Sequence, residues 1–95
     1  MAASPPVDII WTDYMRHRAL VRGFDLAVIE HILRFSSERY FDTVTHRMVA
    51  VGRHGSRLVR VPYEQEHDTV TPITIHTTAR QQINVRLRTG RFTIP

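Results

Sequence analysis

Cysteine and lysine are both absent from this chain of 95 residues. Without cysteine, the chain has no disulfide scaffold, thiol nucleophile or cysteine-based zinc site. Its apolar runs extend for only a few residues, far short of the roughly 20 that span a bilayer. The first six residues have neither the basic nor the apolar region of a signal peptide. We therefore expect a soluble, cytoplasmic protein that makes no contact with a membrane.

The rest of the composition is that of an ordinary globular protein. The chain is 42% hydrophobic and 23% charged, which argues against disorder. Because domains of roughly 100 residues are common, we expect residues 1–95 to form a single domain.

Because lysine is missing, every fixed positive charge belongs to one of 13 arginines. The guanidinium group binds phosphate bidentately and stacks on bases. The alternative is that a GC-rich genome, which favours arginine codons, is the whole cause of the missing lysine. Residues 1–68 contain nine arginines and nine acids, whereas residues 69–95 contain four arginines and no acid. The net charge of +4 therefore lies in the last quarter of the chain. This distribution predicts an anionic partner, either nucleic acid or an acidic protein.

Two helices are predicted after a short strand over residues 7–11. Thr12 is suited to cap a helix that ends near Arg22, before Gly23. Asp25 is suited to cap a second helix that ends at residues 36–37. The apolar face of this second helix is predicted to consist of Leu26, Val28, Ile29, Ile32, Leu33 and Phe35.

Three strands are predicted next, over residues 47–53, 57–64 and 70–76, because polar and apolar residues alternate there. The acidic segment 64–68 is interpreted as a solvated hairpin loop, with a metal site as the alternative. A last helix is predicted from a capping box at Thr78 to just before Gly90, with Ile83 and Leu87 as its apolar side. The order β-α-α-β-β-β-α indicates an α+β fold.

The alternation also predicts a register for the sheet. Pairing Arg53 with Arg57, and Glu64 with Val70, gives one apolar face for the two helices to cover. That face would comprise Val49, Val51, Val59, Val61, Ile73 and Ile75. Arg60 and His76 would then be diagonal neighbours on the other, uncovered face. Their surroundings there would be small residues, namely Ala50, Gly52 and Thr74.

This arrangement would form a shallow electropositive groove, with Arg80 closing one side. Cleavage of RNA needs a base, an acid and a cation that stabilises the phosphorane. We assign Arg60 and Arg80 to the phosphate and His76 to proton transfer as base or acid, with Glu64 as a weak second proton-transfer group. The alternative is that His76 and these arginines are solvated surface groups.

The last helix would also present a polar stripe for RNA or a protein partner, formed by Arg80, Asn84, Arg88 and Arg91. None of the six histidines stands two or four residues from another, so no metal site is predicted. No cofactor is predicted either, since glycine-rich phosphate loops and dinucleotide fingerprints are missing from the sequence.

Several short patterns occur in a familiar order. They are Arg22-Gly-Phe-Asp25, Asp42-Thr43, the strands over residues 47–53 and 58–63, and the segment from Ile73 to Gln81. In this order they resemble the BrnT-like toxins of the RelE/ParE superfamily. The resemblance implies two N-terminal helices packed on an antiparallel sheet, with a C-terminal helix.

The resemblance further implies a toxin of a type II toxin–antitoxin pair, bound by a cognate antitoxin protein. Most members of the superfamily cleave mRNA without a metal ion, on or off the ribosome, whereas the ParE branch inhibits DNA gyrase. Arg60, His76 and Arg80 match the placement of the catalytic residues in the ribonucleases. The chain lacks the lysines of the ribosome-dependent members and the Tyr or His that several members keep after the last helix. A gyrase inhibitor and an inactive binding module therefore remain as alternatives.

Overall fold

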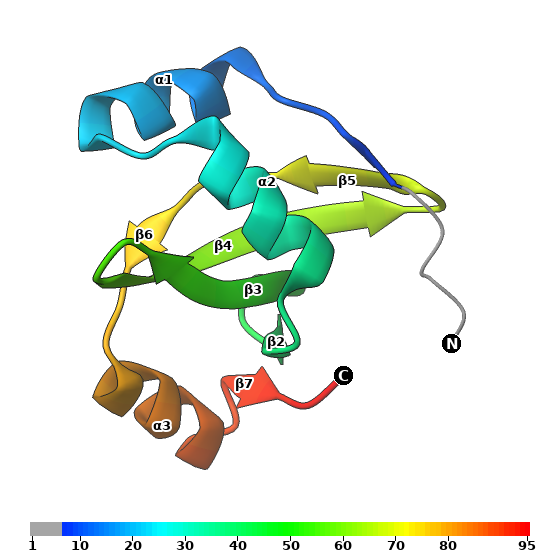
Figure 1. Ribbon diagram of the computed structural model, residues 1–95. Coiled ribbons are helices and arrows are strands. Elements are labelled where there is room, and N and C mark those ends of the chain that lie inside the picture. Colours follow the sequence, from blue (N-terminus) through cyan, green and yellow to red (C-terminus); the bar gives the residue numbers. More distant parts are fainter. Residues whose placement is uncertain (1–6) are drawn as a thin grey trace.

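A mostly antiparallel sheet separates two helices on one of its faces from a third helix on the other (Figure 1). The computed structural model describes residues 7–95 and confirms the predicted α+β class. Residues 1–6, on which the expectation of no signal peptide depends, lie outside the described residues. Within residues 7–95, none of the helices has the length and apolar character that crossing a bilayer requires.

The helices are α1 (Asp13–Arg22), α2 (Leu26–Phe35) and α3 (Arg80–Arg88). The strands are β1 (Asp8–Ile9), β2 (Arg39–Asp42), β3 (Arg47–His54), β4 (Arg57–Glu66), β5 (Thr69–Pro72), β6 (His76–Thr77) and β7 (Phe92–Thr93). The strand order is β1-β5-β4-β3-β2-β7, and β6 pairs with β4 beyond the end of β5. Only the β1–β5 pair is parallel among the described strands. Strands β2 and β7, which have four and two residues, were not predicted from the sequence.

The caps of the first two helices are confirmed. The Thr12 hydroxyl accepts a hydrogen bond from the Met15 N–H at 3.1 Å, and Gly23 ends α1 with a φ of 74°. The Asp25 carboxylate accepts from the Ala27 N–H at 2.8 Å. The prediction that Phe35 belongs to the apolar face of the second helix is wrong. Its side chain is 70% exposed and lies against His31 instead of joining the core.

The register of β3 against β4 differs from the prediction by one residue. His54 pairs with Arg57 across the two-residue loop Gly55–Ser56, so Arg53 lies opposite Leu58. Gly55 has a φ of 63°, which a tight hairpin of this length favours. Since a shift of one residue turns a side chain to the opposite face, Val49 and Val51 do not share a face with the apolar residues of β4.

The pairing of β4 with the following segment is also corrected. Strand β4 continues to Glu66, and Glu64 pairs with Thr71 instead of Val70. Farther along, Arg60 pairs with His76. From Glu64 to Arg60 the chain of β4 advances by four residues, whereas its partner advances by five from Thr71 to His76. The partner therefore contains one extra residue, which interrupts the expected strand over 70–76 and separates β5 from β6.

As a result the sheet is buried on both faces. Helices α1 and α2 cover a core that contains Met15, Ala19, Ile29, Ile32, Leu33, Ala50, Val59, Val61, Tyr63 and Ile75. The opposite face contains a second core of Tyr40, Val49, Val51, Ile83 and Phe92. Helix α3 lies over this second face through the fully buried Ile83 and through Leu87 (Figure 1). The expectation of an uncovered sheet face is therefore wrong.

The start of α3 differs from the predicted capping box. The helix begins at Arg80 after Ala79, and no side chain of residues 7–95 caps its first turn. The Thr78 hydroxyl instead donates to the Gln82 side-chain oxygen at 3.1 Å. The predicted end is confirmed, because the helix stops before Gly90, whose φ is 78°.

Gly52 faces α2 and not a groove, as does Ala50 on the same strand. A Cβ atom at Gly52 would lie 2.7 Å from the Ile32 Cγ1 atom. We predict that G52A lowers the free energy of unfolding by about 1–3 kcal/mol through overpacking, measured by urea denaturation. In an I32A background, which removes the clashing atoms, the same change should have little effect. Additive effects in the double mutant would contradict the predicted clash.

Candidate functional site

Arg60 and His76 lie directly opposite each other on β4 and β6, so their side chains share a face of the sheet. The predicted proximity is therefore confirmed, with a direct pair in place of the expected diagonal. Both side chains are half-buried. Around them is a pocket of about 660 Å³, which we call the arginine pocket. Its lining residues are Arg22, Arg60, His76, Thr77, Gln81, Gln82, Val85, Arg86, Thr89 and Arg91.

The pocket forms where the sheet ends at β6, which pairs with β4 alone among the described strands. Figure 1 shows β6 between α1 and α3. Helix α1 packs on the opposite face of the sheet through Met15 and Ala19. Arg22, the last residue of α1, nevertheless lines the pocket. Helix α3 supplies the other wall, including Arg86.

The pocket has a large excess of positive charge. Four arginines line it, and no carboxylate does so within residues 7–95. The nearest counter-charge is Asp42, whose Oδ2 atom lies 3.3 Å from Arg91 Nη2. Burial raises the pKa of Asp42, but the hydrogen bonds from Arg91 and from two backbone N–H groups outweigh this effect. The pKa is therefore below its ordinary value, and this carboxylate stays charged. Arg91 is thus neutralised, whereas Arg22, Arg60 and Arg86 form no ion pair within the described part of the chain.

Arg60 has the most strongly perturbed guanidinium. Burial lowers its pKa to about 10, and the charges of Arg86 and Arg91 contribute to this effect. Its Nε atom is buried and has no hydrogen-bond partner among residues 7–95. A buried donor without an acceptor costs free energy, and the repulsion between the arginines adds to that cost. A bound anion would relieve this repulsion.

His76 is surrounded by cations. Burial lowers its pKa to about 4, with further contributions from Arg60, Arg18, Arg22 and Arg86. The imidazole is therefore neutral at pH 7. Its Nδ1 atom lies 3.3 Å from Nη2 of Arg18, a residue of α1.

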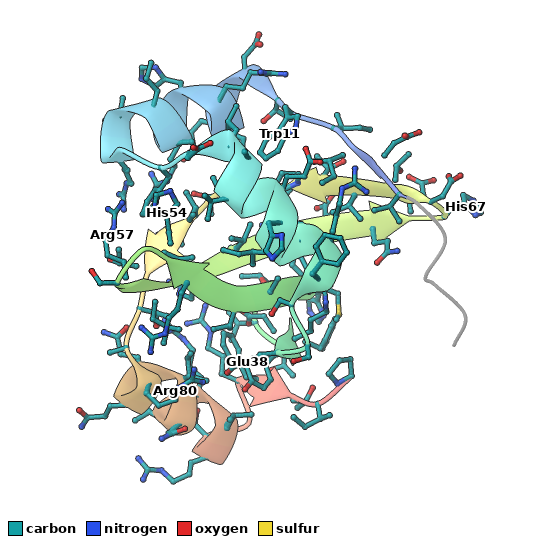
Figure 2. All side chains as sticks on the ribbon, in the orientation of Figure 1. Trp11, Glu38, His54, Arg57, His67 and Arg80 are labelled. Carbon is teal, nitrogen blue, oxygen red and sulfur yellow. The ribbon has the colours of Figure 1, made fainter. Side chains whose placement is uncertain are left out.

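Arg80, predicted to close the groove, does not line the pocket. Its guanidinium forms an ion pair with Glu38, which lies just before β2. Figure 2 labels both residues. The same Glu38 oxygen accepts a hydrogen bond from the Tyr40 hydroxyl at 2.7 Å. Burial and the Glu38 carboxylate raise the pKa of Tyr40 to about 12. The position of Arg80 was mispredicted because Glu38, a contact 42 residues away in the chain, binds it elsewhere.

The other predicted site residues divide between the pocket and the surface. Arg91 lines the pocket, whereas Asn84 and Arg88 lie outside it on the exposed side of α3. Glu64 is far from Arg60 along β4 and binds Arg47 at 3.1 Å. It is therefore unsuited to be the second proton-transfer group.

Seven of the ten pocket residues were not predicted, and the polar or charged ones among them include Arg22, Gln81, Gln82 and Arg86. Arg86 belongs to the acid-free C-terminal segment that predicted an anionic partner, but nothing in the sequence singled it out from the other arginines there. No pattern in the sequence indicates that Arg22 approaches residues more than fifty positions away. Metal-binding clusters of three or more histidine, cysteine or carboxylate side chains do not occur within residues 7–95.

Comparisons of this chain with family models, curated proteins and solved structures gave no match. The resemblance to BrnT-like toxins therefore stays a prediction, and a function has to be inferred from the geometry of the arginine pocket.

The crowding of like charges predicts that the pocket weakens the fold. The depressed pKa of Arg60 means that its charged form destabilises the folded state at every pH below about 10. We expect R60M to raise the free energy of unfolding by about 1 kcal/mol in low salt, measured by urea denaturation. The gain should shrink as salt screens the pocket. R16M, which replaces an exposed arginine of α1, is the control and should change stability little. A loss of stability in R60M would show that Arg60 has a structural role.

Proposed function

We propose that this protein is the toxin of a type II toxin–antitoxin pair, and that its arginine pocket binds a phosphate of mRNA during metal-independent cleavage. The observation that carries the proposal is the half-buried Arg60 among three further arginines, in a pocket that no carboxylate of residues 7–95 lines. Such a site needs an anion to balance it.

Phosphodiesters suit this pocket in both chemistry and size. Guanidinium groups form paired hydrogen bonds to phosphate oxygens, and the two glutamines and two threonines of the lining offer further polar contacts to a sugar or base. The volume of about 660 Å³ is within the range of roughly 300–1,000 Å³ that small-ligand sites occupy. One nucleotide with its phosphate fits such a space.

The chemistry would rest mainly on stabilisation of charge. The 2′-hydroxyl attacks phosphorus and gives up its proton to water, and the bond to the 5′-oxygen breaks as that oxygen takes a proton from water. Between these events negative charge accumulates on the other phosphate oxygens. Preorganised cations in a partly desolvated site favour that transition state. Arg22, Arg60 and Arg86 are the available cations, because Arg91 is held by Asp42. His76 lies beside them and is neutral at pH 7, so it does not enter the reaction as a charged general acid.

Purified protein incubated with a labelled RNA in EDTA tests this proposal. We expect cleavage by the wild type and a loss of about 100-fold in R60M, since one transition-state donor typically contributes that much. R16M should cleave like the wild type, because Arg16 is exposed and outside the arginine pocket. R86M should show a loss similar to that of R60M.

Equal cleavage by R60M and the wild type would remove the arginine pocket from the mechanism. Dependence on an added divalent cation would contradict metal-independent chemistry. Binding of RNA without cleavage, abolished in R60M, would support the pocket and reject the ribonuclease.

A non-enzymatic function is the second candidate, and one observation favours it. No lining residue other than His76 titrates between pH 3 and 9 in ordinary circumstances, so a second proton-transfer group is missing from the described pocket. In this case the arginines would bind an acidic surface of a protein such as DNA gyrase. Blocked supercoiling with intact cellular RNA would support this candidate. RNA fragments formed soon after induction would exclude it as the main activity.

Under both candidates we propose an antitoxin as the protein partner, with acidic residues that neutralise the same arginines. Co-expression with its antitoxin should relieve growth arrest, whereas R60M should relieve it without the antitoxin.

A further inference from the structure

Arg18 makes an unusual contact, because it donates a hydrogen bond to a histidine. Its Nη2 atom lies 3.3 Å from Nδ1 of His76. Arginine has only donors and stays charged under ordinary conditions, so Nδ1 must be the acceptor. A neutral imidazole has one N–H group, and that group must then be at Nε2. The contact thus selects one of the two tautomers of His76.

The position of Arg18 is set by the packing of α1 and not by an acidic partner. Met15 and Ala19 of the same helix are buried in the core. Arg18 Nη1 also donates to the Tyr14 hydroxyl at 3.4 Å, while its Nε atom is buried without a partner within residues 7–95. It forms no ion pair within the same residues. The guanidinium is therefore held against His76 at some energetic cost.

We propose that Arg18 is a positioning residue that fixes His76 as the neutral Nε2–H tautomer, so that His76 donates a hydrogen bond to the phosphate and does not accept a proton. The hydrogen bond from His76 to phosphate rests on the proposed function. The choice of tautomer by Arg18 does not, because it concerns the unliganded protein. A neutral histidine that polarises an oxygen by donating a hydrogen bond has precedent in enzyme chemistry.

Two features prevent His76 from being a base. Its lone pair at Nδ1 is covered by Arg18, so a proton can be added there only if Arg18 moves away. The charged groups that act on it are also all cations, namely Arg60 from β4, Arg18 and Arg22 from α1, and Arg86 from α3. These charges oppose the imidazolium form. Both features leave the Nε2–H group available as a donor.

Nitrogen-15 NMR of histidine-labelled protein, titrated from pH 4 to 8 without RNA, tests the tautomer. H76Q identifies the signal of His76 among the six histidines. In the wild type we expect Nδ1 to be unprotonated and Nε2 protonated throughout the neutral range. R18M keeps the aliphatic stem and removes the donor, so the Nδ1–H form should become detectable and the pKa of His76 should rise by about one unit. R16M is the matched control on the same helix, and R18K should restore the wild-type behaviour in part.

A substantial Nδ1–H population in the wild type would overturn the proposal without need of any variant. Identical tautomers and titration in R18M and the wild type would do the same.

Cleavage assays then separate this inference from the proposed function. If His76 donates to the phosphate, R18M should cleave RNA several-fold more slowly, and R18K should recover part of the rate. If His76 is instead a base, R18M should cleave faster, because the lone pair is uncovered and more basic. No cleavage by any form, together with the expected NMR result, would reject the ribonuclease and keep the assignment of Arg18.

Discussion

The pairing of β3 with β4 through the two-residue loop Gly55–Ser56 is the constraint on which the rest of the structure depends. It places Val59 and Val61 towards α1 and α2, and it places Arg60 beside Val51 on the face that α3 covers. A register shifted by one residue would move Val49 and Val51 to the α1 and α2 face and leave α3 with little to pack on. The position of the arginine pocket follows from this pairing.

The pocket occupies the place where the second core ends. Ile83 and Leu87 of α3 pack on Val49, Val51 and Phe92, and beyond these apolar residues α3 and β6 face each other with polar groups. The covering helix makes Arg60 partly desolvated but leaves space for a ligand. Such a site is costly for the folded state, since buried cations without partners are unfavourable. Functional sites often carry such local costs.

The chain contains internal acceptors for some arginines and not for others. Glu38 binds Arg80 and Asp42 binds Arg91, and both ion pairs attach the C-terminal segment to the region of β2. Arg22, Arg60 and Arg86 have no such partner within residues 7–95. The difference separates arginines that stabilise the fold from arginines available to an external anion, a distinction that net charge cannot make.

The sequence by itself determined the features that depend on residues close together in the chain, namely helix boundaries and strand positions. Thr12, Gly23 and Asp25 set the helix boundaries through local hydrogen bonds and backbone conformation, and alternation predicted strands β3 and β4. Even the shared face of Arg60 and His76 was predictable, because the actual pairing of their strands differs from the predicted one by two residues, which keeps the face. Only the tertiary structure decided the one-residue shift of β3, the capture of Arg80 by Glu38 and the approach of Arg18 and Arg22 to His76. These contacts join segments distant in the chain, and their energies depend on packing that no local pattern encodes.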